Sequence, residues 1–153
     1  IRNPTRLLQL GLLCEKYNFI LKYPNPLIYN NGWLSGFLDS DGSIYLNVSS
    51  GQIFITASQK NKLLLDPLVE LYGGSIYTLP KVQAFKWILF RKNEILALTD
   101  YFVKYPLRSK KMVRLRLISS IYECFHNSAS TSIPNSFQGK IWKRLLEKWN
   151  NYK

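Results

Sequence analysis

Two carboxylates and a glycine close an apolar segment of the sequence. Asp39 and Asp41 follow the helical, mostly apolar residues 33–38, and Gly42 comes directly after them. Acidic groups at a helix C-terminus face the negative end of the helix dipole, at a cost of roughly a few tenths of a kcal/mol or more. We therefore expect at least one of these carboxylates to serve a purpose other than folding, and binding a divalent cation is the chemistry that suits it.

A solvated turn is the alternative interpretation of the same residues, because aspartate, serine and glycine are common turn residues. An EF-hand calcium loop is excluded by spacing. That loop needs glycine at its sixth position and glutamate at its twelfth. Counted from Asp39, those positions hold Ile44 and Ser50.

Composition narrows the class of protein that carries this segment. The 153 residues suffice for one domain with a substantial core, and 46% hydrophobic content excludes disorder as the main state. A net charge of +12 favours a polyanionic partner, either nucleic acid or an acidic membrane face. No apolar run approaches the roughly 20 residues that span a bilayer. The first residue, Ile1, leads us to expect a processed product or an excised segment.

Cysteine and histidine are too sparse for most metal or nucleophile sites. Cys14 and Cys124 are far apart and form no CxxC pair, which favours reduced thiols in an intracellular setting. His126 is the only histidine, so a histidine-based metal cluster or a Ser-His-Asp triad is disfavoured.

The elements that must position Asp39 and Asp41 follow from periodicity and breakers. A helix capped by Thr5 is expected first, then a proline-broken linker at residues 23–27, and a main domain from Asn30. Two strand pairs follow: 43–49 with 52–59, and 75–79 with 84–90. The further helices are expected at 66–72, from Asn93 or Glu94 to Lys104, at 109–125 and at 139–150, with a polar loop at 127–136. This order predicts an α+β fold with an antiparallel sheet and helices on one face.

One face of the first strand pair carries amides, hydroxyls and aromatic rings. These are the groups that read base edges, and a two-stranded ribbon fits the major groove. A solvated sheet face has the same alternation and is the alternative. Cations lie instead near strand ends, where phosphates would lie. The polar face comprises Tyr45, Asn47, Ser49, Gln52, Phe54, Thr56 and Ser58, and the cations are Lys60, Lys62, Lys81, Lys86, Arg91 and Lys92.

The densest basic cluster, residues 104–116, leads into the helix expected from Ser109. The helix dipole disfavours cations at a helix N-terminus, so we prefer phosphate capture over a merely solvated helix face. The basic C-terminal helix, with Trp142 and Trp149, fits core packing and backbone contact equally well.

These motifs together resemble the LAGLIDADG homing endonucleases and related intron-encoded maturases. Residues 34–42 match the nine-letter signature at most positions. The segments 57–60, 72–77, 87–88 and 105–111 resemble later family motifs in the same order, so that the resemblance covers residues 30–150. It implies the αββαββα fold over residues 30–153, with a sheet that forms a DNA-binding saddle and helices on the other face. Residues 1–29 would form a helical arm and linker.

The resemblance also implies a mechanism, namely Mg²⁺-dependent double-strand DNA cleavage in intron homing. Asp41 and the Gly42 carbonyl would bind Mg²⁺, for which Mn²⁺ or Ca²⁺ can substitute in binding. Gln59 would order the attacking water, and Lys110 or Lys111 would polarise the solvent or stabilise charge. Asp39 would shape the helix end. Two motif helices would pack through Leu34, Ser35, Gly36, Leu38 and Asp39, and the DNA contacts would be Tyr45, Asn47, Ser49, Gln52, Phe54, Thr56, Ser58, Lys60, Tyr77, Lys81 and Lys86.

The sequence contains one motif copy, whereas the mechanism needs two. The chain is expected either to form a homodimer or to be the C-terminal half of a two-repeat protein, with residues 1–29 ending the preceding repeat. Two other functions stay open: an RNA maturase that assists group I intron splicing, and a catalytically inactive, sequence-specific DNA-binding module. A membrane partner is not expected. Localisation in mitochondria, or alternatively in chloroplasts, is implied by the resemblance alone.

Overall fold

The structure, a computed structural model, describes residues 3–127 and 133–151. The predicted order of helices and strands is confirmed, while the part of the predicted polar loop at 128–132 lies outside the described residues. The elements are α1 (Pro4–Lys16), α2 (Trp33–Asp41), β1 (Gly42–Asn47), β2 (Gln52–Gln59), α3 (Asp66–Tyr72), β3 (Ser75–Leu79), β4 (Ala84–Leu89), α4 (Lys92–Lys104), α5 (Lys111–His126) and α6 (Phe137–Asn150).

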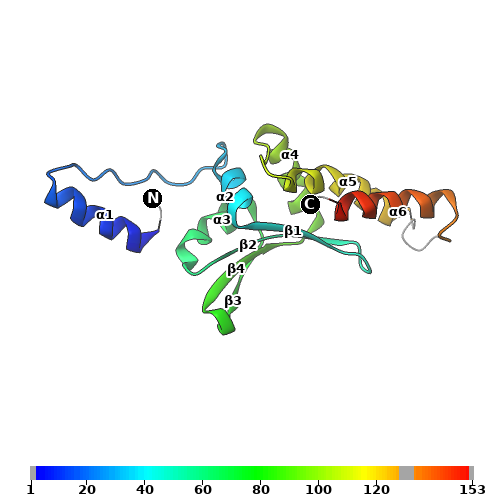
Figure 1. Cartoon of the computed structure of the whole chain (residues 1–153), viewed down its shortest axis with the longest axis horizontal. Coiled ribbons are helices and arrows are strands. Elements are labelled where there is room, and N and C mark those ends of the chain that lie inside the picture. The colour runs from blue at the N-terminus through cyan, green and yellow to red at the C-terminus, as the bar shows by residue number, and fades with distance from the viewer. Residues whose placement is uncertain (1–2, 128–132, 152–153) are drawn as a thin grey trace.

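The four strands form one antiparallel sheet in the order β1-β2-β4-β3 (Figure 1). Ile44 pairs with Ile55, and Ile55 pairs in turn with Leu89 across β4. Because side chains alternate between the two faces of a strand, this register places one continuous apolar layer on a single face of the sheet.

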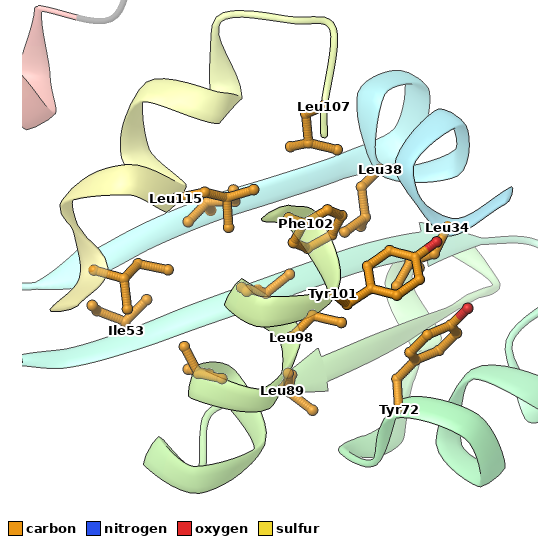
Figure 2. Packing of buried hydrophobic residues seen from close by; sticks show 14 of the residues in the cluster. Leu34, Leu38, Ile53, Tyr72, Leu89, Leu98, Tyr101, Phe102, Leu107 and Leu115 are labelled. Carbon is orange, nitrogen blue, oxygen red and sulfur yellow. The ribbon is translucent and has the colours of Figure 1, made fainter. Parts of the chain in front are cut away.

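The helices cover that apolar face and close the core (Figure 2). Leu34 and Leu38 of α2, Phe102 of α4 and Leu115 of α5 belong to one buried cluster with the sheet residue Ile53. Truncating one such buried leucine to alanine costs about 2–5 kcal/mol. The predicted α+β class, with helices on one face of an antiparallel sheet, is confirmed.

Local side-chain hydrogen bonds move several element boundaries away from the predicted positions. Asn3, not Thr5, caps α1, because its side chain accepts a hydrogen bond from the Arg6 amide at 3.2 Å. The first strand ends at Asn47, two residues early, since Asn47 Oδ1 accepts from the Ser49 amide at 3.2 Å and starts the turn. Ser49 therefore lies outside the ribbon.

The arm at the N-terminus lies apart from the sheet (Figure 1). Each residue of α1 is described, and none is buried. Leu8 and Leu12 are 70% and 62% exposed, and residues 19–29 continue as a segment without regular structure. The arm is thus a helix with a solvent-facing apolar side, followed by a linker.

Candidate active site and nucleic-acid interface

Asp41 and Gln59 meet where α2 passes into the sheet. Gly42 ends α2 by adopting an extended backbone, and β1 starts at this residue. A Cβ on Gly42 would lie 2.6 Å from the Leu38 carbonyl oxygen, so the tight junction requires glycine. Gln59 ends β2, and its Nε2 donates a hydrogen bond to Asp41 Oδ2 at 2.6 Å. The structure therefore brings together two residues that the sequence assigned to one site.

The oxygen donors at this junction suit a hard divalent cation. Asp41 is exposed, and the hydrogen bond from Gln59 engages only Oδ2. Mg²⁺ prefers oxygen ligands and commonly takes one or two carboxylates, with waters and substrate phosphates completing its shell. In the described part of the chain, no three His, Cys, Asp or Glu side chains gather closely enough to hold a metal ion. Asp41 and the Gly42 carbonyl stay the predicted ligands of a divalent cation at this junction.

Asp39 performs a different task from Asp41, because it fastens the segment before α5 to the end of α2. Its carboxylate accepts hydrogen bonds from the Arg108 amide at 2.7 Å, the Ser109 amide at 3.1 Å and the Ser109 hydroxyl at 2.5 Å. Burial alone would raise the pKa of Asp39, but these bonds and the charge of Lys111 hold it below its ordinary value. The predicted role in shaping the helix end agrees with this geometry.

The two candidate lysines differ in what they contact. The Lys111 ammonium donates to the carbonyl oxygens of Leu38 at 2.8 Å and Asp39 at 2.9 Å. A cation there offsets the negative end of the α2 dipole, which Asp39 and Asp41 otherwise reinforce. Lys110 is exposed at the N-cap of α5. The helix begins at Lys111 rather than at Ser109, because Asp39 engages Ser109.

The side of the motif helix that the chain leaves open differs from the predicted interface. Leu34 and Leu38 are 0% and 1% exposed and belong to the core of this chain, so their assignment to a helix–helix interface is wrong. Ser35 is also buried and donates to the Tyr105 carbonyl oxygen. Of the five residues predicted for that interface, Gly36 is the one that is exposed, and a Cβ there would meet nothing within 4 Å.

Beside Gly36 lies a shallow hollow of ≈ 380 Å³. Gly32, one helical turn before Gly36, lines it together with Asp39 and Tyr105. Small residues four apart on one side of a helix let another helix backbone approach closely. The open side of α2 is therefore its Gly32–Gly36 side.

Most of the predicted DNA-contacting side chains lie on the face of the sheet opposite the core. The exposed members of the set within the strands and turns are Tyr45, Asn47, Ser49, Ser58, Lys60, Tyr77 and Lys81, while Gln52, Phe54 and Lys86 are half-buried. Burial raises the pKa of the Tyr45 phenol above its ordinary value.

Thr56 departs from the prediction, because it is only 3% exposed. Lys86 pairs with Ser58, yet its ammonium lies 5.6 Å from the ring centroid of Tyr45, which pairs with Phe54. The Lys86 side chain thus crosses Thr56, which lies between Phe54 and Ser58 on β2. Buried in this way, Thr56 is not available for base contact.

Two residues have roles that the sequence did not reveal. Arg114, assigned to the basic phosphate-capturing cluster, donates to the carbonyl oxygens of Ile44 at 2.6 Å and Trp149 at 3.1 Å, and its guanidinium lies 5.2 Å from the Trp149 ring centroid. It therefore joins α5 to β1 and α6.

Phe90 adds a third ring beside Phe54 on the outer face of the sheet. Within residues 3–127 and 133–151 no helix is both long and apolar enough to cross a bilayer.

Comparison with known proteins agrees with this fold and site. The sequence model of the LAGLIDADG endonuclease family matches residues 34–122, from the motif helix into α5. The chain belongs to the LAGLIDADG endonuclease family. The match begins at Leu34 and includes both Asp41 and Gln59, the two residues that the structure places in contact.

Curated relatives are longer than this chain. The intron-encoded DNA endonuclease ai2b of Dictyostelium discoideum is 37% identical over 160 residues, which cover 98% of this chain and 60% of the relative. The intron-encoded RNA maturase bI4 of Saccharomyces cerevisiae is 35% identical over 158 residues, which cover 99% of this chain and 25% of the relative. The chain thus spans between a quarter and three fifths of these two proteins.

Solved structures show the same fold at low sequence identity. The meganuclease I-SmaMI, bound to uncleaveable DNA, superposes with a TM-score of 0.63 at 15% identity, over 91% of this chain and 50% of that chain. The predicted LAGLIDADG homing-endonuclease fold is confirmed.

Proposed function

We propose that this chain supplies one half of the active site of a site-specific, double-strand DNA endonuclease that acts in intron homing. The contact between Asp41 and Gln59, at the end of a helix whose glycine side is open, is the observation that carries the proposal. Family membership and a net charge of +12 support a nucleic-acid substrate.

In this proposal Asp41 and the Gly42 carbonyl hold a divalent cation, for which Mg²⁺ is the expected metal. When bound, the cation supplies an activated water and stabilises the leaving oxygen of the scissile phosphodiester. Gln59 orients the Asp41 carboxylate through its hydrogen bond. Lys111 holds the helix end that carries Asp41, which leaves Lys110 as the lysine that faces the substrate phosphate.

The second half is a second motif helix that packs on the Gly32–Gly36 side of α2. We propose that it comes from a preceding repeat of a longer protein, a homodimer being the alternative. A short similarity between α1 and α6 supports this origin, because α1 would be the last helix of that repeat. Leu13, Glu15, Lys16 and Asn18 recur in α6 as Leu145, Glu147, Lys148 and Asn150, and the aromatic Tyr17 corresponds to Trp149.

Replacing Asp41 by asparagine in the full-length protein tests the proposal. Cleavage of duplex DNA that contains the intron-insertion junction, with Mg²⁺ present, should fall at least a hundredfold, while binding with Ca²⁺ present should persist. Asp100→Asn, at an exposed position on α4, is the matched control and should cleave normally. Undiminished cleavage by Asp41→Asn would contradict the proposed role of Asp41.

An RNA maturase is the second candidate, favoured by the 35% identity to the RNA maturase bI4. Asp41→Asn separates the two functions, because it should leave RNA binding and splicing intact while it removes cleavage. An inactive DNA-binding module instead predicts tight, salt-dependent site binding by the unaltered protein and no Mg²⁺-dependent nicking. We also propose a mitochondrial setting, with the chloroplast as the alternative, because the relatives are intron-encoded.

A further inference from the structure

Three aromatic side chains form a row across the outer face of the sheet. Tyr45 and Phe54 are direct cross-strand partners, and their rings stack with centroids 4.7 Å apart and planes 9° from parallel. Phe90, just after β4, continues the row with its ring centroid 6.2 Å from that of Phe54. This face is the one opposite the core, so the row needs a purpose other than packing against the helices.

The charge around the row favours nucleic acid over a protein partner. None of the four strands contains an aspartate or a glutamate. Lys86 lies over the Tyr45 ring. Phe90 lines a hollow of ≈ 800 Å³ that also includes Tyr122 of α5. At this hollow Arg91 is ion-paired with Glu94, and Lys92 lies over the Tyr122 ring. An apolar row that carries a lysine and has no carboxylate within its strands complements a polyanion that also presents apolar groups.

The orientation of the rings decides which apolar group fits. A base that stacks needs an open ring face. Here one face of Tyr45 and one face of Phe54 are pressed together, and Lys86 lies over the Tyr45 ring. Because side chains project roughly perpendicular to a sheet, the stacked rings present their edges to a ligand on this face. Ring edges suit contact with methyl groups rather than stacking with bases.

In the major groove of DNA, the C5-methyl group of thymine is the apolar feature that proteins contact. We propose that the row Tyr45–Phe54–Phe90 reads thymine methyl groups in the half-site that this chain contacts. This inference rests on the proposed function, and it adds Phe90 to the DNA-contacting set. In this proposal the chain recognises its DNA site partly through apolar contacts of the row and partly through the amide groups of Asn47 and Gln52.

The test begins with selection from a randomised duplex DNA library on the full chain, followed by resynthesis of the enriched duplex with deoxyuridine in place of thymidine. Each lost methyl contact should weaken binding about fourfold, from roughly 0.8 kcal/mol per buried methyl-sized group. The replacement changes the DNA alone, so folding of the protein does not affect the comparison. Equal affinity for the two duplexes would overturn the inference.

Two variants assign the effect to the row. Phe54→Leu and Phe54→Ala should each reduce the affinity difference between the two duplexes, by up to about fourfold, while the contacts of Tyr45 and Phe90 remain. Gln52→Ala, a change to a polar residue on the same face, should keep the full difference. A thymidine preference that is undiminished in both Phe54 variants would also overturn the inference. If selection enriches no sequence at all, both the proposed DNA function and this inference fail, whereas an enriched site without thymidine dependence removes the inference alone.

Discussion

Replacing Lys111 by methionine removes a cation from the end of the motif helix while its apolar stem is kept. The lost contacts are two hydrogen bonds from the ammonium, 2.8 Å to the Leu38 carbonyl oxygen and 2.9 Å to the Asp39 carbonyl oxygen. A charged donor in such bonds, together with its favourable position at a helix C-terminus, contributes about 2 kcal/mol after allowance for partial exposure. Lys111→Met should lower the free energy of unfolding by this amount.

Urea unfolding monitored by circular dichroism measures the loss. With a slope of about 2 kcal/mol per molar urea, the midpoint should fall by about 1 M. Lys110→Met, one residue earlier and exposed, is the matched control and should unfold within about 0.5 kcal/mol of the unaltered chain. In the complete endonuclease it should instead weaken cleavage. Equal stability of the two variants would refute the assignment of Lys111 as the anchor of the helix.

Two further changes test how the site is held together. Asp39→Asn should cost about 1–2 kcal/mol at pH 7 because the bonds from Arg108 and Ser109 lose their charged acceptor. The native pKa of Asp39 lies below the unfolded value of 3.8. The stabilisation by the Asp39 carboxylate is therefore complete above that value and is lost as pH falls through the native pKa. The urea midpoints of Asp39→Asn and the unaltered chain should converge at acid pH. A gap between the midpoints that stays constant with pH would contradict this. Gly42→Ala should lower the free energy of unfolding by about 1–3 kcal/mol, because the added Cβ would lie 2.6 Å from the Leu38 carbonyl oxygen. An unchanged thermal unfolding midpoint would show that the junction is less tight than described.

Much of the fold was predictable because the local signals agree with the final packing. Alternation in residues 43–49 and 52–59, with turn residues between them, predicts the first hairpin, which the structure forms from Gly42–Asn47 and Gln52–Gln59. The contact between Asp41 and Gln59 follows from that hairpin, since Gly42 pairs with Ala57 and so places Gln59 beside the end of α2.

The predicted interface of the motif helix combines both of its sides: it includes Gly36, which faces open space, but also Leu34 and Leu38, which lie in the core. Positions four apart share a helix face, so Leu34 and Leu38 lie together, and Gly32 and Gly36 lie together about half a turn away. The nine-letter signature includes residues from both sides of the helix, so a match to it does not distinguish them. The periodicity alone would have put the leucines in the core and the glycines at the surface.

Other features depend on contacts between segments distant in the sequence. Lys110 and Lys111 are neighbours of the same type, and only the docking of residues 105–110 on Asp39 decides which ammonium meets α2. Thr56 alternates correctly for the outer face but is covered by the long side chain of Lys86, which reaches across to another strand. Sequence patterns carry no information about such crossings.

The measurement that tests the central claim most directly is the mass of the purified chain in solution, by light scattering over a concentration series. Whether a preceding repeat or a second copy supplies the second motif helix in the complete protein, the open Gly32–Gly36 side of the isolated chain should pair with another copy. The average mass should therefore rise toward that of a dimer with concentration. Gly36→Phe, which fills open space and spares the core of the chain, should stay monomeric, and Ala97→Phe, at an exposed position on α4, should associate normally. Identical mass curves for Gly36→Phe and the unaltered chain would contradict the account, because the pairing surface would then lie elsewhere.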